Sequence, residues 1–434
     1  MSGEKSFEIL EKIFIPKNKT EEIKGYTMKY GHIYENENIV DEVLVSYFKA
    51  PKSYTAENMC EINSHGGIII MRKILELCLK NGAELASPGE FTKRAFLNGR
   101  MDLSQAESVI DIINAKSERE AKEGMKHLEG ALKLEISNIK RILLELMTNI
   151  EVSIDYPEYD TPEVENSDIS EKINQLREKL TKLEKSFDEG KVLKEGIKTA
   201  IIGKPNAGKS SLLNAILKEE RAIVTEIEGT TRDTIEEFVT INGIPIKLVD
   251  TAGIRNTENL VEKIGIEKSK NIAENADLII AILDCSRELE EEDFEILKIA
   301  KNKKSIIILN KIDLSAKFDE NDEVLKDFTG NIIKISALQK IGLEELYQKI
   351  SDLFNFNEIN FDGSVLITNQ RHKNLISKAI QSLEKANQDL NNNMPVDIIE
   401  ISLYDVLSDL GAISGEKAGE EVIDEIFSRF CLGK

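Results

Sequence analysis

The chain has 434 residues, of which 41% are hydrophobic and 31% charged, so it is long enough for two or three globular domains of ordinary composition. Its 57 basic and 78 acidic residues give a net charge of −21, which argues against a general polyanion-binding surface; contact with RNA would need a local patch or a partner. No apolar run approaches the roughly 18–20 residues that span a bilayer, and the N-terminus has no signal-peptide pattern, so we expect a cytoplasmic protein without membrane contact.

The first 80 residues indicate a mixed α/β region. Residues 43–47 and 68–70 are short apolar runs that predict strands, and residues 71–80 have helical apolar spacing that ends at Asn81-Gly82. The cysteines have neither metal-ligand spacing nor a disulfide framework, so we expect four reduced thiols. They are Cys60, Cys78, Cys285 and Cys431.

From Leu103 onward the apolar residues recur every three or four positions, which predicts long helices with one apolar seam each. The two seams, separated by Tyr156-Pro157, are Leu132, Ile136, Ile139, Leu143, Leu146 and Ile150, and then Ile169, Ile173, Leu176, Leu180, Leu183 and Phe187. They are typical of a helical bundle core; contact with another chain is the alternative.

Residues 197–350 alternate apolar runs with helical stretches, the rhythm of a doubly wound α/β sheet. The predicted strands are residues 199–202, 247–249, 278–283, 305–309 and 332–335. Asn242-Gly243 predicts a hairpin, and therefore one antiparallel strand pair. After residue 370 helical spacing returns at Leu375, Ala379, Ile380 and Leu383, then at Val406, Leu407 and Leu410. We therefore expect an α/β module inserted between two helical segments that pack together as one domain.

Residues 203–210 match the phosphate-binding loop G-x-x-x-x-G-K-S between a predicted strand and a predicted helix. Backbone N–H groups of Asn206, Ala207 and Gly208 can surround phosphates at the helix N-terminus. Ser211, in the first turn of the predicted helix, belongs to the same predicted GTP-binding set. Lys209 can neutralise the β- and γ-phosphates, and the Ser210 hydroxyl can bind Mg²⁺. A match of this kind alone could also be a glycine-rich helix start.

Three further motifs follow strands in the order that a guanine-nucleotide site requires. Asp250-Thr251-Ala252-Gly253 places a carboxylate near the metal and a glycine near the γ-phosphate. Asn310-Lys311-Ile312-Asp313 offers an aspartate that accepts N–H groups of guanine, a lysine over the base and an asparagine that holds the loops. Ser336-Ala337 supplies a backbone contact to the guanine oxygen. Together these motifs predict a GTP/GDP site.

The residue after Gly253 is Ile254, whose aliphatic side chain cannot orient a water molecule as the glutamine of Ras-type GTPases does. No arginine finger is evident in the sequence. Hydrolysis must therefore be completed in another way.

The chain resembles the tRNA modification GTPases called MnmE or TrmE over nearly its whole length. The resemblance rests on Gly203 to Ser211, Gly229-Thr230-Thr231-Arg232-Asp233, Asp250 to Gly253, Val261-Glu262-Lys263-Ile264-Gly265-Ile266-Glu267, Ser64-His65-Gly66-Gly67, Pro88-Gly89-Glu90-Phe91-Thr92, Asp102-Leu103-Ser104-Gln105-Ala106-Glu107 and Cys431-Leu432-Gly433-Lys434. These flanking motifs are more specific than the phosphate-binding loop.

The resemblance implies a multidomain chain that combines α/β and all-α parts. A small α+β folate-binding and dimerising domain would cover residues 1–97, and the helical domain would cover 98–194 and 356–434. A P-loop GTPase domain at 195–355 would be inserted in the helical one. Family members usually open with a strand and a glycine-rich loop ahead of Arg-Ile-Ser-Gly, whereas this sequence begins at Met1-Ser2-Gly3. We therefore expect a shortened N-terminus, from a misassigned start or a truncation, or else weaker folate binding and dimerisation.

The resemblance also implies that two GTPase domains meet in a homodimer and that K⁺ takes the place of an arginine finger. The K⁺ ligands would be Asn206, Thr225, Ile227 and Thr230; Thr231 would join Ser210 on Mg²⁺, and Glu262 would orient the attacking water. From its position alone Glu262 would be a solvated surface acid. Arg232, Asp233 and Arg255 correspond to switch residues, with ordinary surface ion pairs as the alternative.

A partner flavoprotein of the MnmG or GidA type, which carries FAD, is implied as well. The pair would install an aminomethyl-type group on carbon five of the wobble uridine in certain tRNAs, with the carbon from formyl- or methylene-tetrahydrofolate. Glu57, Glu61 and Arg100 are the folate-side candidates, with Cys431 and Lys434 at the C-terminal signature. A buried thiol is the alternative for Cys431, and prenylation fits Cys431-Leu432-Gly433-Lys434 poorly.

Two other functions share parts of this pattern. A related ribosome-assembly GTPase would have the same nucleotide motifs, but it would normally carry a basic RNA-binding module, which this acidic chain does not indicate. A scaffold that binds GTP without turnover is the second alternative.

Overall fold

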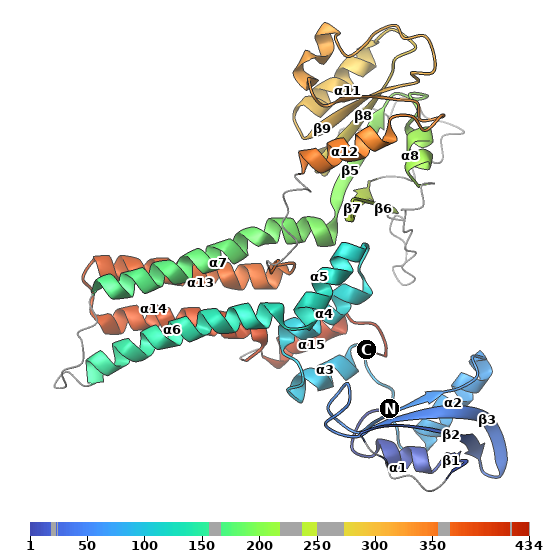
Figure 1. Cartoon of the computed structure of the whole chain (residues 1–434), viewed down its shortest axis with the longest axis vertical. Helices are drawn as coiled ribbons and strands as arrows, with labels where there is room; N and C mark the ends of the chain where they lie inside the picture. Colours follow the sequence, from blue (N-terminus) through green and yellow to red (C-terminus); the bar gives the residue numbers. More distant parts are fainter. Residues whose placement is uncertain are drawn as a thin grey trace. The chain divides into compact units, whose positions relative to one another are not determined.

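A computed structural model describes most of the chain (Figure 1). The chain forms two compact units. The described residues are 1–18, 23, 25–155, 166–217, 237–249, 273–354, 365–416 and 419–433. Unit 1 comprises residues 1–113, 124–177 and 378–434, and unit 2 comprises residues 114–123 and 178–377.

The N-terminal part of unit 1 is an antiparallel sheet with helices packed on it. The strands β1 (Phe14–Pro16), β2 (Tyr26–Glu35), β3 (Asn38–Phe48) and β4 (Met59–Asn63) pair in that order, and the helices are α1 (Ser6–Glu11) and α2 (Ile68–Lys80). Val43, Val45 and Tyr47 alternate into the core, as a half-buried strand requires, which confirms the strand predicted at residues 43–47.

The prediction of a strand at residues 68–70 is wrong, because these isoleucines begin helix α2. The Met71 amide donates to the Gly67 carbonyl, which closes the first helical turn. Ile70, Ile74 and Leu77 then face the same core at helical spacing, while Ile68 and Ile69 remain 78% exposed. Packing of one helical face thus overrides the local strand preference of three β-branched residues.

The C-terminal helix α15 (Glu420–Ser428) packs against α3 (Glu90–Leu97) and α4 (Leu103–Ile113) in unit 1. Gly89 precedes α3 with a φ of +70°, and a Cβ atom there would lie 2.7 Å from the Phe427 carbonyl oxygen. Ile423, Phe427 and Phe430 are buried in the same cluster. The beginning of the helical region and the end of the chain therefore form one core.

Long helices make up the rest of the helical region: α5 (Glu118–Leu128), α6 (Ala131–Asp155), α7 (Asn166–Glu195), α13 (Gln370–Asn391) and α14 (Val396–Ser414). All twelve residues of the two predicted seams are buried. In unit 1, α6 packs against α14, and the Ser170 hydroxyl of α7 donates to the Asn387 side chain of α13 at 3.2 Å. Segments before and after the α/β module thus pack together, as predicted; the break at Tyr156-Pro157 lies outside the described residues.

The module in unit 2 is a six-stranded sheet with the order β10-β9-β8-β5-β7-β6, parallel except for β6. Its strands are β5 (Ile197–Gly203), β6 (Glu237–Ile241), β7 (Ile244–Leu248), β8 (Leu278–Asp284), β9 (Ser305–Asn310) and β10 (Ile332–Ile335); its helices are α8 (Lys209–Leu217), α11 (Glu291–Lys301), the short 3-10 helix η1 (Glu323–Phe328) and α12 (Leu343–Leu353). One apolar core lies on each face, so the central strands are buried throughout. The doubly wound sheet is confirmed.

The predicted hairpin is also confirmed. Ile241 pairs with Ile244 across a two-residue turn in which Asn242 and Gly243 have φ values of +51° and +81°, as a type I′ turn requires. The parallel strands β5, β8, β9 and β10 end at one edge of the sheet, so the loops after them are brought together.

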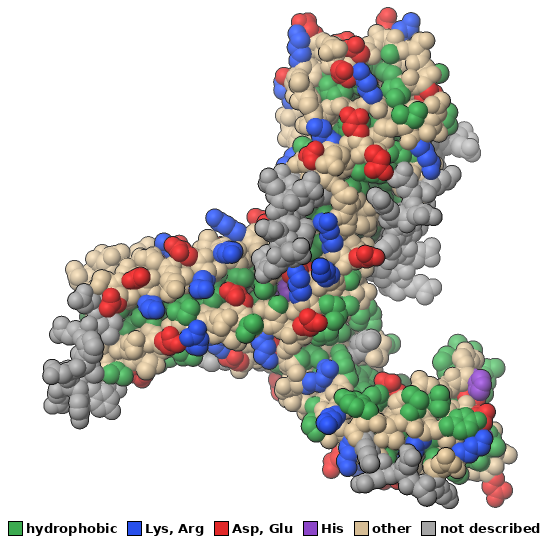
Figure 2. Space-filling view, viewed as in Figure 1, with side chains coloured by type: hydrophobic (Ala, Val, Ile, Leu, Met, Phe, Trp, Pro, Cys, Tyr) green, Lys and Arg blue, Asp and Glu red, His purple; other side chains and the backbone are tan. Residues whose placement is uncertain are grey.

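Acidic and basic side chains are interspersed over the described residues on the face drawn in Figure 2. Among the described helices, none is long and apolar enough to cross a membrane.

Candidate nucleotide-binding site

The loop between β5 and α8 contains the predicted phosphate-binding residues. Asn206 and Gly208 have φ values of +63° and +105°, so the backbone curls before α8 begins at Lys209. A Cβ atom at Gly203 would lie 2.7 Å from the Ile282 carbonyl oxygen, which explains a glycine where the loop leaves the sheet. The loop therefore ends at the N-terminus of a nine-residue helix, a location that favours anions.

Lys209 closes this loop. Its ammonium donates to the carbonyl oxygens of Gly203 at 2.6 Å and Lys204 at 2.7 Å, and burial lowers the pKa of Lys209. Ser210 is the second residue of the helix and is half-buried, whereas Ser211 is exposed. The first two residues of α8 thus supply a cation and a hydroxyl oxygen at the helix end where phosphate and Mg²⁺ would be held, and a hydroxyl is an oxygen ligand of the kind Mg²⁺ takes.

Asn310 at the end of β9 ties three loops together. Its side-chain nitrogen donates to the Ala207 carbonyl at 2.8 Å, and its side-chain oxygen accepts from the Ala337 amide at 3.0 Å. A Cβ atom at Gly208 would lie 2.0 Å from that nitrogen. Asn310, which was predicted to hold the loops, is 3% exposed, and its side chain links the phosphate-binding loop to the loop after β10.

Asp313 and Ser336 form a second contact between these loops. The Ser336 hydroxyl donates to the Asp313 carboxylate at 2.6 Å and accepts from the Gln339 amide at 3.2 Å. Ser336 is buried, while Asp313 is exposed and can accept N–H groups from a base. The structure therefore brings together the described part of the predicted guanine-binding residues: Asn310, Lys311, Asp313, Ser336 and Ala337.

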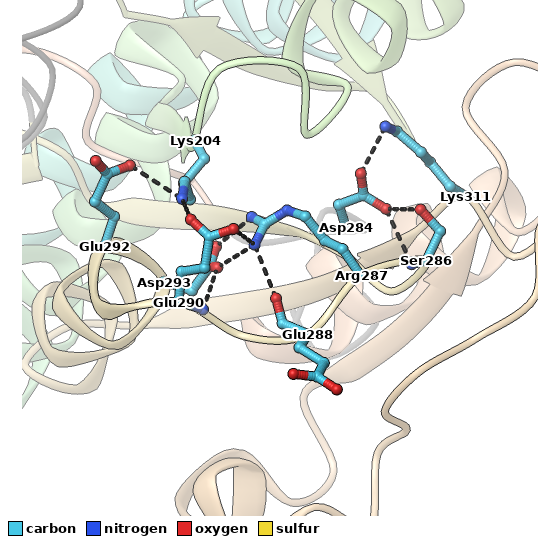
Figure 3. Close-up of polar contacts among 9 residues, drawn as sticks. All are labelled: Lys204, Asp284, Ser286, Arg287, Glu288, Glu290, Glu292, Asp293 and Lys311. Atoms are coloured by element: carbon cyan, nitrogen blue, oxygen red, sulfur yellow. Dashed lines mark hydrogen bonds and ion pairs between the residues drawn. The ribbon is translucent and has the colours of Figure 1, made fainter.

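One contact was not predicted from the sequence. The Lys311 ammonium donates to the Asp284 carboxylate at 2.6 Å, and the Ser286 amide and hydroxyl donate to the other carboxylate oxygen (Figure 3). Burial raises the pKa of Asp284, but the hydrogen bonds from Lys311 and Ser286 outweigh it and hold that pKa below its ordinary value. The sequence signal that could have indicated this contact is an aspartate at the end of an apolar strand, where a parallel sheet places its functional residues.

Several predicted residues lie outside the described residues. They are Thr225, Ile227, Thr230, Thr231, Arg232, Asp233, Asp250, Thr251, Ala252, Gly253, Arg255, Glu262 and Lys434. Asn206, the remaining predicted K⁺ ligand, is an exposed residue of the phosphate-binding loop.

The folate-side candidates are distributed over unit 1. Glu57 accepts hydrogen bonds from the Ser2 hydroxyl at 2.7 Å and from Arg94 at 3.2 Å, and Arg100 lies 4.9 Å from the centre of the Tyr54 ring. Glu61 is an exposed residue of β4. Arg94, which the sequence did not single out, connects Glu57 to Glu90.

The four cysteines are free thiols, three of them buried. Cys431 is exposed, so the alternative of a buried thiol at this position is wrong. Its carbonyl accepts a hydrogen bond from the Gly89 amide at 3.4 Å, which places the C-terminal signature beside the start of α3.

Comparison with known proteins covers the whole chain. Residues 1–100 match the family described as "GTP-binding protein TrmE N-terminus", and residues 103–431 match "MnmE helical domain". The tRNA modification GTPase MnmE of Clostridioides difficile is 50% identical over 437 residues, which is 100% of this chain and 95% of that protein. The protein of the same name from Thermoanaerobacter pseudethanolicus is 51% identical over 440 residues, with the same coverage.

Among solved structures, the G domain of the T. maritima FeoB iron transporter is 28% identical, with a TM-score of 0.26, and covers 36% of this chain and 98% of that one. Aquifex aeolicus Era bound to GDP and AlF4⁻ is also 28% identical, with a TM-score of 0.26, and covers 43% of this chain and 66% of that one. Two family matches that together span nearly all 434 residues, and relatives about half identical over the full chain, show that this chain belongs to the MnmE (TrmE) family of tRNA modification GTPases.

Proposed function

We propose that this chain is a K⁺-activated GTP hydrolase that acts, with an FAD-containing partner of the MnmG type, on the wobble uridine of certain tRNAs in the cytoplasm. The observation that carries the GTPase assignment is the Asn310 side chain, which holds the phosphate-binding loop and the loop after β10 in one site. Family membership supports the tRNA assignment.

The predicted residues divide the proposed nucleotide site into a phosphate part, a metal part and a guanine part. Asn206 to Ser211 bind the phosphates, Ser210 and Thr231 hold Mg²⁺, and Asp250 to Gly253 contact the metal and the γ-phosphate. Lys311 lies over the base, and Asp313 with Ala337 reads guanine. Bound Mg²⁺ would supply positive charge between the phosphates, and the Lys209 ammonium, which donates to the Gly203 carbonyl of the loop, would add to that charge.

Hydrolysis is proposed to occur between two copies of the chain. K⁺ on Asn206, Thr225, Ile227 and Thr230 supplies the positive charge of an arginine finger, Glu262 orients the water, and Arg232, Asp233 and Arg255 respond to the nucleotide. The domains proposed for this cycle are residues 1–97, 98–194 with 356–434, and 195–355. Glu57, Glu61, Arg100, Cys431 and Lys434 are the proposed contacts to reduced folate or the modified base.

Steady-state GTP hydrolysis by the full chain in KCl and in NaCl tests whether K⁺ activates the enzyme. We expect faster turnover in KCl, because only an ion of suitable size replaces the missing arginine. Equal rates in both salts would remove the K⁺ site from the proposal.

The variant Glu262→Ala tests whether Glu262 orients the attacking water. We expect it to keep GTP affinity and lose most turnover, while Glu295→Ala, an exposed glutamate on α11, behaves as the parent. Parent-like hydrolysis by Glu262→Ala would mean that another group positions the water.

Mass analysis of wobble nucleosides tests the tRNA assignment. Cells that lack the gene should lose the carbon-five aminomethyl-type group and regain it with the parent gene but not with Glu262→Ala. Intact modification in the deletion strain would discard the tRNA assignment and leave the GTPase assignment standing.

A further inference from the structure

The backbone of Lys311 has a φ of +69°, in the left-handed region that a residue with a long side chain rarely occupies. Such conformations concentrate at functional sites, where the surroundings hold them. The Lys311 side chain is 32% exposed, and its ammonium is held at 2.6 Å by the carboxylate of Asp284, which is 8% exposed. A nearly buried anion therefore determines where this lysine lies.

Asp284 is itself fixed on both sides. One carboxylate oxygen accepts from the Ser286 amide at 3.0 Å and the Ser286 hydroxyl at 2.6 Å, which leaves the other oxygen for Lys311. Asp284 is also paired in register with Asn310 at the ends of β8 and β9. These contacts hold the Asp284 carboxylate in place, so its position determines where the Lys311 ammonium lies.

Residues 284–293, which we call the bridging segment, also reach the phosphate-binding loop (Figure 3). Lys204 of that loop pairs with Glu290 and lies 3.3 Å from Glu292. Arg287 and the fully buried Asp293 form two hydrogen bonds, at 2.8 and 3.0 Å, that brace the segment in between. Asp284 thus belongs to a segment that contacts both the phosphate-binding loop and the loop after β9.

We propose that Asp284 is a positioning residue for guanine-nucleotide binding, because it anchors the Lys311 ammonium and thereby keeps the aliphatic part of that side chain over the base. This inference rests on the proposed function, in which Lys311 lies over guanine. A lysine that is already ordered loses less side-chain freedom when the nucleotide binds. Removal of the anchor is expected to weaken GDP binding about five- to tenfold, the upper value being ~1.4 kcal/mol at 25 °C.

A double-mutant cycle on the full chain tests the inference through GDP dissociation constants. The four proteins are the parent, Asp284→Ala, Lys311→Ala and the double variant. We expect Asp284→Ala to weaken GDP binding about five- to tenfold in the parent and less than about twofold in the Lys311→Ala background, because the anchor then has nothing to hold. Asp284→Asn, which retains an oxygen for Ser286 but loses the charge, should resemble Asp284→Ala.

The matched control is Asp327→Ala, because Asp327 pairs with Lys301 at the same distance of 2.6 Å but on the exposed surface of the same module. It should leave GDP affinity unchanged. Equal effects of Asp284→Ala in both backgrounds would show that Asp284 acts on the fold and not through Lys311, which overturns the inference, as would parent-like affinity of Asp284→Ala. If Lys311→Ala itself binds GDP like the parent, the proposed role of Lys311 at the base fails, and that result is visible without any Asp284 variant.

Discussion

Substitution of Asn310 by alanine should disconnect the loops of the nucleotide site. The side chain is 3% exposed, and both of its polar atoms are used, one by the Ala207 carbonyl and one by the Ala337 amide. An alanine leaves both backbone groups without that partner, at about 1–3 kcal/mol each, so the assembled loop arrangement loses ~2–6 kcal/mol.

The lower limit already predicts a large loss of affinity. About 2 kcal/mol corresponds to roughly 30-fold weaker GDP binding at 25 °C, since each 1.4 kcal/mol is tenfold. Titration of the full-length Asn310→Ala protein with a fluorescent GDP analogue measures this loss. Native-state hydrogen exchange of the Ala337 amide measures the broken contact directly, and its protection should fall.

The matched control is Asn302→Ala, an exposed asparagine at the C-terminal end of α11 whose side chain donates to the Lys298 carbonyl at 3.4 Å. This variant should bind GDP like the parent. Affinity of Asn310→Ala within about threefold of the parent, together with an unchanged Ala337 exchange rate, would refute the view that this side chain holds the loops, because ~0.6 kcal/mol is below the cost of even one lost buried partner.

Gly208→Ala should abolish GDP binding, because its Cβ would lie 2.0 Å from an amide nitrogen, whereas Gly330→Ala has a similar φ of +87° with open space around it and should retain binding; equal affinities would contradict this steric reasoning. Asp313→Asn should weaken GTP and favour xanthosine triphosphate, and an unchanged guanine preference in competition binding would show that this residue does not read the base. Gly89→Ala should lower the free energy of local opening of α15 by ~2–5 kcal/mol, because a left-handed alanine costs ~1–2 and a 2.7 Å backbone contact ~1–3 kcal/mol, and hydrogen exchange in α15 measures the change. Gly82→Ala has a φ of +104° and open space around it, so it should leave that exchange unchanged; equal protection in both variants would argue against the contact.

Local patterns were sufficient where a feature depends on neighbours in the chain. The seams of α6 and α7, the Asn242-Gly243 turn and the strand–loop–helix order at residues 197–217 follow from apolar periodicity and turn chemistry, and the structure confirms them. Because motif order implies which strand ends carry polar residues, the grouping of Asn310, Asp313 and Ser336 could be predicted as well.

Other features depended on which strands and helices become neighbours. Ile68 to Ile70 have strand preference, but a helical face that packs on the N-terminal core decided their conformation. Cys431 gave no sequence signal for its exposure.

The contacts of the bridging segment could not be predicted from local sequence patterns. Asp284 is 27 residues from Lys311, and Lys204 is 86 residues from Glu290, so only the strand order β9-β8-β5 brings these charges together. Sequence by itself determined that this chain has a guanine-nucleotide site with Ile254 in place of a water-orienting glutamine, because those features lie within short motifs. Tertiary structure decided how the loops of that site are tied to one another, because a contact between distant residues depends on packing that no local pattern encodes.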